Sequence, residues 1–268
     1  MIKPKQENMR CRICNSTNLS LFYQQGNNNQ FKYYKCKNCG LVNLDLTGLK
    51  ITEHQQQYFE RFVPPHDYEE EKGAYHAYGF IKKHVPFGER YLDIGCGWGR
   101  VLYFARKDGW KVKGIEISPQ YAEYVQDRLN IEVDVADFLQ YENPGEKFDL
   151  VSLRHVLEHL PDSLLAMKKI YDFLINDGYA HFEFPNINSV SHRLKRFLSR
   201  SGIYKKKYSP TYLPGHCNEF SKKTFMYLLN KTGFQLIRWE TYSFKPLNNF
   251  IYNRIHIGTK ARAIVKKV

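Results

Sequence analysis

The fold of this chain is decided by residues 90–117, which read RYLDIGCGWGRVLYFARKDGWKVKGIEI. Residues 90–94 predict a strand, the glycine run 95–99 a loop, residues 100–107 a helix and residues 111–117 a second strand. A strand that passes through a glycine loop into a helix opens a parallel sheet covered by helices. Glu116 ends the second strand, where a carboxylate can accept hydrogen bonds from a ribose.

The alternation of strands and helices continues after residue 117, which predicts an α/β fold with a doubly wound sheet. Before residue 90 the pattern predicts helices over 54–86. After residue 185, we expect Ser221 to cap a helix that ends at Gly233. The tail 247–268 allows two interpretations, either a last strand and helix of the fold or a helix that lies on a membrane surface. The expected helices are 119–129, 160–174, 191–198 and 222–232, and the expected strands are 131–133, 148–153, 179–184 and 234–242.

The spacing of the glycine loop separates it from dinucleotide-binding loops. The sequence has Asp93 followed by Gly95, Gly97 and Gly99, whereas dinucleotide sites have G-x-G-x-x-G. A pyrophosphate requires a helix N-terminus free for its negative charge. The acid beside this loop instead suits a cationic ligand with an amino group.

These residues resemble the class I S-adenosylmethionine-dependent methyltransferases over about residues 85–185, and more weakly to Phe234. The resemblance implies a mostly parallel seven-stranded sheet, a Rossmann-like methyltransferase fold and S-adenosylmethionine as cofactor. It assigns the glycine loop to the methionine part of the cofactor, Glu116 to the ribose and the residues after the second and third strands to the adenine. The cofactor-binding residues implied are Asp93, Gly95, Gly97, Trp98, Gly99, Glu116, Ile117, Asp137, Phe138 and Arg154.

Four cysteines precede this domain as two C-x2-C pairs, Cys11 with Cys14 and Cys36 with Cys39. Each C-x2-C turn presents two thiolates to one side of a zinc ion, so two turns complete a tetrahedron. Disulfides are the alternative, but the N-terminus lacks the apolar centre of a signal peptide, which favours a reducing compartment. We expect residues 1–50 to form a zinc ribbon with a structural Zn²⁺, and residues 51–268 to form the methyltransferase domain.

The segment after the fourth strand, RHVLEHLPD at 154–162, is the candidate acceptor side. His155, Glu158 and His159 would share one face if the segment were helical, and could hold a divalent metal or act as acid and base. The Glu-His pair resembles two groups of metal-dependent O-methyltransferases, those of ubiquinone biosynthesis and those that modify small-RNA 3′ ends. In the second group a later His completes the ligand set, which corresponds here to His216.

Several roles remain open for these candidate catalytic residues, His155, Glu158, His159 and His216. His216 could be a metal ligand with Glu158 and His159, or a general base that takes the proton of an attacking hydroxyl. Glu158 could instead cap backbone amides, and His159 could be a hydrogen-bonded core residue without a chemical role.

The net charge of +13 is concentrated in the last third of the chain. Residues 185–268 carry 17 Lys and Arg against two acids, Glu219 and Glu240. Such a field attracts phosphate, nucleic acid or an anionic membrane surface. We expect the basic insert at about 185–220 to form a lid over the acceptor, with its lysines and arginines holding phosphate.

The leading interpretation is an S-adenosylmethionine-dependent O-methyltransferase that acts on a sugar hydroxyl of a phosphate-bearing acceptor, because ribbon and domain together resemble bacterial surface-polysaccharide methyltransferases. An RNA methyltransferase that grips nucleic acid with the lid and ribbon is the alternative. The sequence has no apolar run of the roughly 20 residues that span a membrane. It favours a cytoplasmic location, with contact to the inner face of the membrane as an added expectation.

Overall fold

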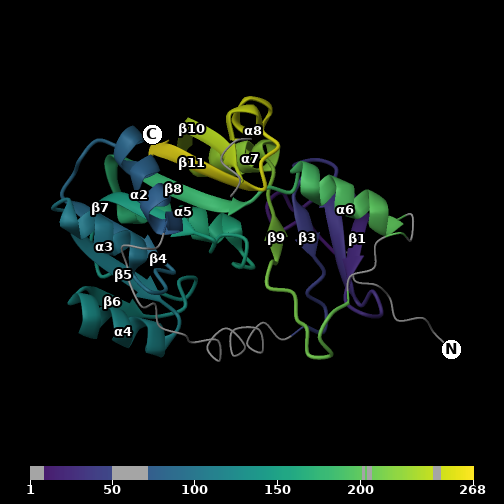
Figure 1. Ribbon diagram of the computed structural model, residues 1–268, viewed down its shortest axis with the longest axis horizontal. Helices are drawn as coiled ribbons and strands as arrows, with labels where there is room; N and C mark the ends of the chain where they lie inside the picture. Colours follow the sequence, from purple (N-terminus) through teal and green to yellow (C-terminus); the bar gives the residue numbers. More distant parts are fainter. Residues whose placement is uncertain (1–8, 50–71, 201–202, 204–206, 244–248) are drawn as a thin grey trace.

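A computed structural model describes residues 9–49, 72–200, 203, 207–243 and 249–268 of the chain. Its larger sheet has seven strands in the order β10-β11-β8-β7-β4-β5-β6 (Figure 1). β6, β5, β4, β7 and β8 pair in parallel, and β11 runs antiparallel to both β8 and β10. The strands are β4 (Arg90–Ile94), β5 (Lys111–Glu116), β6 (Glu132–Val135), β7 (Phe148–Arg154), β8 (Leu174–Pro185), β10 (Phe234–Tyr242) and β11 (Lys260–Lys267). The mostly parallel seven-stranded fold predicted from the sequence is confirmed.

Helices cover both faces of this sheet. α2 (Lys72–His84), α3 (Arg100–Lys107) and α4 (Pro119–Leu129) pack on one face, and α5 (Ser163–Phe173) and α7 (Lys222–Thr232) on the other. α7 has the predicted boundaries, because the Ser221 side chain accepts a hydrogen bond from the amide of Thr224 and Gly233 ends the helix with φ +74°. The tail forms α8 (Asn249–Ile255) and β11, so it supplies the last helix and strand of the fold.

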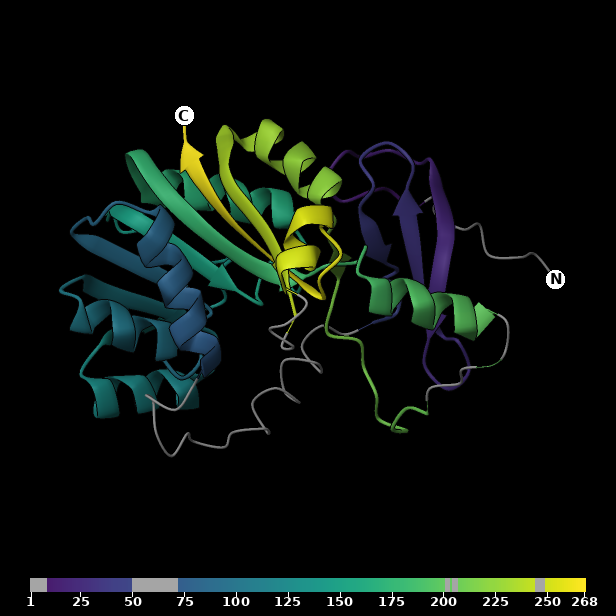
Figure 2. The same cartoon turned by 45° about the horizontal axis from the view of Figure 1, so that its top comes forward.

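The N-terminal segment forms a second sheet with the strand order β1-β2-β3-β9. β1 (Leu19–Gln25), β2 (Phe31–Cys36) and β3 (Val42–Leu44) belong to the predicted ribbon. β9 (Asn218–Glu219) comes from the insert after β8 and pairs antiparallel with β3 (Figures 1 and 2). The ribbon sheet is therefore completed by a strand from the catalytic domain.

The insert lies mainly against the ribbon. Its helix α6 (Val190–Arg200) runs beside β1 in both ribbon views, with the Arg196 guanidinium 4.7 Å from the ring centroid of Phe22 (Figure 2). Further along, the side-chain amide of Asn27 donates to the Tyr208 carbonyl oxygen at 3.0 Å, and the Tyr212 hydroxyl donates to Oε1 of Gln25 at 2.6 Å.

Some predicted boundaries differ from the structure. The helix expected from residue 160 begins at Ser163, because the Asp162 side chain caps it by accepting from the amide of Leu165 at 2.9 Å. The next strand starts directly at Leu174 rather than at residue 179. Of the helices expected over 54–86, only α2 lies among the described residues. None of the described helices is both long enough and apolar enough to cross a membrane.

Candidate functional site

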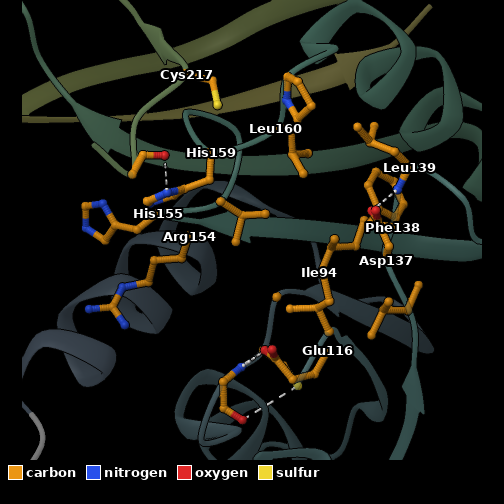
Figure 3. A pocket seen from close by; sticks show the side chains of 18 of the residues that line it. Ile94, Glu116, Asp137, Phe138, Leu139, Arg154, His155, His159, Leu160 and Cys217 are labelled. Carbon is orange, nitrogen blue, oxygen red and sulfur yellow. Dashed lines mark hydrogen bonds between the residues drawn. The ribbon is translucent and has the colours of Figure 1, made fainter. Parts of the chain in front are cut away.

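A cavity of about 630 Å³ opens at the C-terminal ends of β4, β5 and β7. Its first side comes from the glycine loop and from the residues that follow β5 and β6. Its second side comes from residues 154–161 and 213–217, so that His159 and Cys217 lie across the cavity from Glu116 (Figure 3). We call these the cofactor half and the acceptor half. Three ribbon leucines also line the cavity, Leu44, Leu46 and Leu49.

The glycine loop of the cofactor half uses backbone conformations that favour glycine. Gly95, Gly97 and Gly99 have φ values of +67°, +51° and +67°. A Cβ on Gly95 would also lie only 2.4 Å from Cγ2 of Val156. The first glycine therefore lets the loop pass close to the segment that follows β7.

The Glu116 carboxylate fastens this loop to the end of β5. It is buried at 2% exposure, and it accepts hydrogen bonds from the amide of Gly97 at 2.8 Å and from the amide of Ser118 at 3.0 Å. Burial raises the pKa of Glu116 above its ordinary value. The acid that the sequence assigns to a ribose is therefore held in place at the cavity wall before any ligand binds.

Asp93 lies beneath the same loop and accepts a hydrogen bond from the Ser152 hydroxyl. Burial raises the pKa of Asp93 to about 7. A bound cation would favour the ionised carboxylate, so this environment fits the cationic ligand expected from the sequence.

Nine of the ten predicted cofactor residues line the cavity, and the exception is Gly99, the N-terminal cap of α3. Arg154 lies at the cavity edge, with its Nε 3.4 Å from Oε2 of Glu183. The sequence missed four residues of the cofactor half, because they carry no motif of their own. These are Arg100, Ala136, Leu139 and Gln140, and the sequence also did not assign the lining residues Ile94, Cys96, Val101 and Ile115 to the cofactor.

The segment that carries the candidate catalytic residues of the acceptor half is not helical. Residues 157–159 form a turn and His155 has φ +56°, so the condition under which three side chains would share one helix face is not met. The His155 ring bridges two buried carboxylates, with Nδ1 3.3 Å from Glu158 and Nε2 3.2 Å from Glu183, and Nε2 also lies 2.9 Å from Nζ of Lys260.

The charges of His155, Glu158 and Glu183 stabilise one another. Burial would by itself disfavour the imidazolium of His155, but the carboxylates of Glu158 and Glu183 raise its pKa above the ordinary value. Burial would likewise raise the pKa of Glu158, but the hydrogen bond from His155 holds it below the ordinary value. His155 thereby holds both acids in their ionised form.

The structure brings Glu158, His159 and His216 together, with one ligand atom of each within 4.8 Å of the others. His159 Nδ1 lies 2.8 Å from the Gly215 carbonyl oxygen and must donate to it, which leaves the lone pair on Nε2. The second oxygen of Glu158 is buried without a hydrogen-bond partner. A carboxylate and two imidazoles in this arrangement suit a divalent cation or proton transfer.

Only His159 of this group lines the cavity, whereas Glu158 and His216 lie behind its wall. Burial lowers the pKa of His216 to about 4, which keeps the ring neutral near pH 7. A direct catalytic role is therefore easier for His159 than for His216. The sequence alone could not rank them, because both stand in similar short motifs.

The four ribbon cysteines also meet. Cys11 Sγ lies 3.4 Å from Cys39 Sγ, and Cys14 Sγ lies 3.5 Å from Cys36 Sγ. These separations exceed the roughly 2.05 Å of a disulfide and are near the roughly 3.8 Å edge of a zinc–thiolate tetrahedron. All four thiols are unoxidised and their sulfurs gather at one point, so they fit a structural zinc ion.

Arg12, between the first two cysteines, was not singled out from the sequence. Its guanidinium donates to the carbonyl oxygens of Leu44 and Cys217 and, at 3.0 Å, to the side chain of Asn218. These partners lie far away in the chain, so no local pattern could reveal them. From the insert expected to be a lid, only residues within 213–217 line the cavity among those that the structure describes.

Comparison with known proteins agrees with this architecture. Residues 53–238 match the model of the family described as "Methyltransferase domain". A ubiquinone biosynthesis O-methyltransferase from Actinobacillus pleuropneumoniae is 27% identical over 146 residues, covering 51% of this chain and 59% of the relative. An (S)-coclaurine N-methyltransferase from Papaver somniferum is 30% identical over 107 residues, covering 37% of this chain and 30% of the relative. The chain thus matches less than two thirds of either relative's length.

Solved structures share the fold. A SAM-dependent methyltransferase from Thermotoga maritima superposes with a TM-score of 0.55 at 21% identity, covering 81% of this chain and 98% of that one. A SAM-dependent methyltransferase from Archaeoglobus fulgidus gives a TM-score of 0.53 at 19% identity, covering 72% of this chain and 94% of that one.

Proposed function

The chain belongs to the S-adenosylmethionine-dependent methyltransferases, and we propose that it methylates a sugar hydroxyl of a phosphate-bearing acceptor that is either a nucleotide-sugar or a lipid-linked glycan. The observation that carries the O-methylation is the imidazole of His159, which lines the acceptor half and is oriented by the hydrogen bond of its Nδ1 to the Gly215 carbonyl oxygen. S-adenosylmethionine supplies an electrophilic methyl group when it is bound in the cofactor half. Nε2 of His159 would accept the hydroxyl proton as the acceptor oxygen forms its bond to that methyl group.

Residues around His159 favour proton transfer to its Nε2. Gly215 fixes the tautomer of His159 through the hydrogen bond to Nδ1. The ionised Glu158 is close enough to stabilise the imidazolium that forms when Nε2 takes the proton. The neutral His216 adds no positive charge that would oppose this protonation.

The same atoms also fit a divalent metal, which is the second arrangement we consider. Glu158, His159 and His216 would be the ligands, and the unpartnered buried oxygen of Glu158 is the observation that favours it. A metal there would polarise the acceptor hydroxyl. Metal analysis separates the arrangements: a stoichiometry of one zinc for the cysteine cluster alone leaves His159 as a base, and a second bound ion assigns it as a ligand.

The proposal of a phosphate-bearing acceptor rests on the positive charge of residues 185–268, and helix α6 favours a lipid-linked form of that acceptor. This helix carries four cations and no acid. Its apolar residues Val190, Leu194 and Phe197 are exposed, at 48%, 53% and 67%. A short helix with exposed apolar residues and basic neighbours is typical of contact with an anionic membrane surface, where lipid-linked glycans are assembled.

The experiment that tests the function is methyl transfer from S-adenosylmethionine to three acceptor pools: nucleotide-sugars, lipid-linked glycans and total RNA. Mass spectrometry then locates the methyl group. A methyl ether on a sugar of either glycan pool supports the proposal. Methylated RNA, or a methylated nitrogen or carbon, overturns it.

A matched pair of variants tests the base. His159→Asn keeps a donor where Nδ1 meets the Gly215 carbonyl but removes Nε2, and we expect the rate to fall about 10²- to 10⁴-fold. His84→Asn is the control, because Nδ1 of His84 makes a similar contact to the Phe80 carbonyl outside the cavity. Unchanged turnover in His159→Asn would remove His159 from the mechanism.

A further inference from the structure

We propose that Arg12 of the zinc ribbon is a positioning residue for the acceptor half, and that the ribbon is thereby a working part of the active site. Arg12 stands in the turn between Cys11 and Cys14, so the cysteine cluster fixes its backbone. Its own amide is held by the side chain of Asn43 at 3.2 Å. The guanidinium therefore projects from a rigid knuckle.

The guanidinium connects the ribbon to the acceptor half through three acceptors. Nη1 donates to the Leu44 carbonyl oxygen at 2.8 Å, Nη2 to the Cys217 carbonyl oxygen, and Nε to Oδ1 of Asn218 at 3.0 Å. The planar fork of an arginine can hold such a set in one orientation, which the single ammonium of a lysine cannot.

The segment that Arg12 holds is in turn bonded to the turn that carries Glu158 and His159. The amides of Cys217 and Asn218 both donate to the Glu158 carbonyl oxygen, at 2.9 and 3.0 Å. The side-chain amide of Asn218 donates to the Leu160 carbonyl oxygen at 2.7 Å. The path from the ribbon knuckle to the candidate base is therefore an unbroken series of hydrogen bonds.

Further contacts attach the ribbon at the same place. The amide of Leu44 donates to the Cys217 carbonyl oxygen at 2.9 Å, and the Tyr33 hydroxyl donates to the His216 carbonyl oxygen at 3.3 Å. The cysteine knuckle shares one hydrophobic core with Phe225 and Leu229 of α7. Because Leu44, Leu46 and Leu49 also line the cavity, the ribbon shapes the acceptor half as well as supporting it.

Hydrogen exchange of the full-length protein tests the proposal without knowledge of the acceptor. In Arg12→Met we expect the backbone amides of Cys217 and Asn218 to exchange at least about tenfold faster, because the hydrogen bonds that hold this segment to a charged group are lost. The affinity for S-adenosylmethionine and the zinc content should stay as in the unmodified protein, since the cofactor half and the four cysteines are untouched. Arg10→Met is the matched control, because Arg10 is exposed and its guanidinium donates to the Asn15 carbonyl oxygen within the knuckle itself.

Arg12→Lys distinguishes positioning from charge. A lysine keeps the positive charge but cannot make the fork, so we expect most of the faster exchange to persist. Exchange at residues 213–219 equal to that of the unmodified protein in Arg12→Met would overturn the proposal. So would faster exchange spread equally over β4 and β5 with loss of cofactor affinity, because that result would make Arg12 a residue of general stability.

The inference uses the proposed function only for what the acceptor half does. Where a methyl acceptor is available, Arg12→Met should lower kcat while the KM for S-adenosylmethionine is unchanged. If the exchange result holds but no acceptor pool is methylated, the proposed acceptor is wrong and the positioning role of Arg12 stands. If acceptors are methylated and exchange is unaffected, the proposed function stands and the positioning role of Arg12 is wrong.

Discussion

The two halves of the cavity are built in different ways. Most of the cofactor half comes from one run of chain, in which β4, the glycine loop, α3 and β5 follow one another over residues 90–117, and residues 136–140 after β6 complete it. The acceptor half combines the turn after β7, the segment before β9 and the end of the ribbon sheet. Local geometry sets the first half, whereas contacts between distant segments set the second. A substitution should therefore act mainly on the half in which it lies, except where the two halves touch, as Gly95 and Val156 do.

The largest separation is expected for Gly95→Ala. The new Cβ would meet Val156 at 2.4 Å on a backbone with φ +67°, so the affinity for S-adenosylmethionine should fall about 100-fold. Titration calorimetry measures this loss. Gly79→Ala is the control, because Gly79 lies in α2 and a Cβ there meets nothing within 4 Å. Equal affinities of the two variants would contradict the close approach at Gly95.

The next effect is expected at the ribbon metal. Cys39→Ser removes one of four sulfurs, so bound zinc should be lost and the amides of residues 213–219 should exchange faster. Native mass spectrometry and hydrogen exchange measure the two outcomes. Cys96→Ser serves as the control, because Cys96 lies in the glycine loop, so the Cys96→Ser protein should keep the zinc of the ribbon. Full zinc content in Cys39→Ser would show that the cysteines are not the ligands.

A smaller effect is expected on the outer face of the insert. Phe197→Ser removes the most exposed apolar side chain of α6, so binding to vesicles that contain anionic lipid should weaken about tenfold. Phe87→Ser is the matched control, because Phe87 is 66% exposed but lies before β4, outside the basic insert. Equal loss in both variants, or no binding to vesicles at all, would contradict membrane contact through α6.

The smallest effect concerns Glu219, whose carboxylate accepts from the Tyr23 hydroxyl at 2.6 Å across the join between ribbon and insert. Burial raises the pKa of Glu219 to about 7, so the folded protein keeps a proton that the unfolded chain releases above about pH 4.5. The stability that this group contributes is therefore lost as pH rises from about 4.5 to 7.

Glu219→Gln removes this dependence, because the amide does not titrate. Relative to the unmodified protein it should raise the free energy of unfolding at pH 8 by about 1–3 kcal/mol, and change it little at pH 4.5. Urea unfolding at the two pH values measures the difference. Glu142→Gln, on an exposed acid, is the matched control. An equal change at both pH values in Glu219→Gln would contradict the raised pKa.

The cofactor half could be predicted almost residue by residue because its positions are fixed by short spacings. Glycines at 95, 97 and 99 and an acid at the end of the next strand are required by close backbone approach and by strand geometry. Nine of the ten cofactor residues that the family resemblance implies line the cavity. Each C-x2-C turn likewise sets its own two sulfurs close together, and the pairing of β1 with β2 then brings the two turns to one point.

The acceptor half was predicted only as a set of residue types. The spacing of His155, Glu158 and His159 would place them on one face of a helix, but β7 ends at Arg154 and the next residue, His155, has a positive φ and a ring that contacts Glu183. That partner lies on β8, and its nearness follows from the parallel pairing of β7 with β8. Local spacing carries no information about it.

The sequence by itself therefore determined the sheet, the glycine loop, the two cysteine pairs and the family, because each depends mainly on residues close together in the chain. The tertiary structure alone decided that β9 completes the ribbon sheet, that His159 rather than His216 faces the cavity, and that Arg12 joins the ribbon to the acceptor half. These features depend on which distant segments share a hydrophobic core and satisfy one another's backbone groups. These contacts between distant segments form only when the whole chain packs.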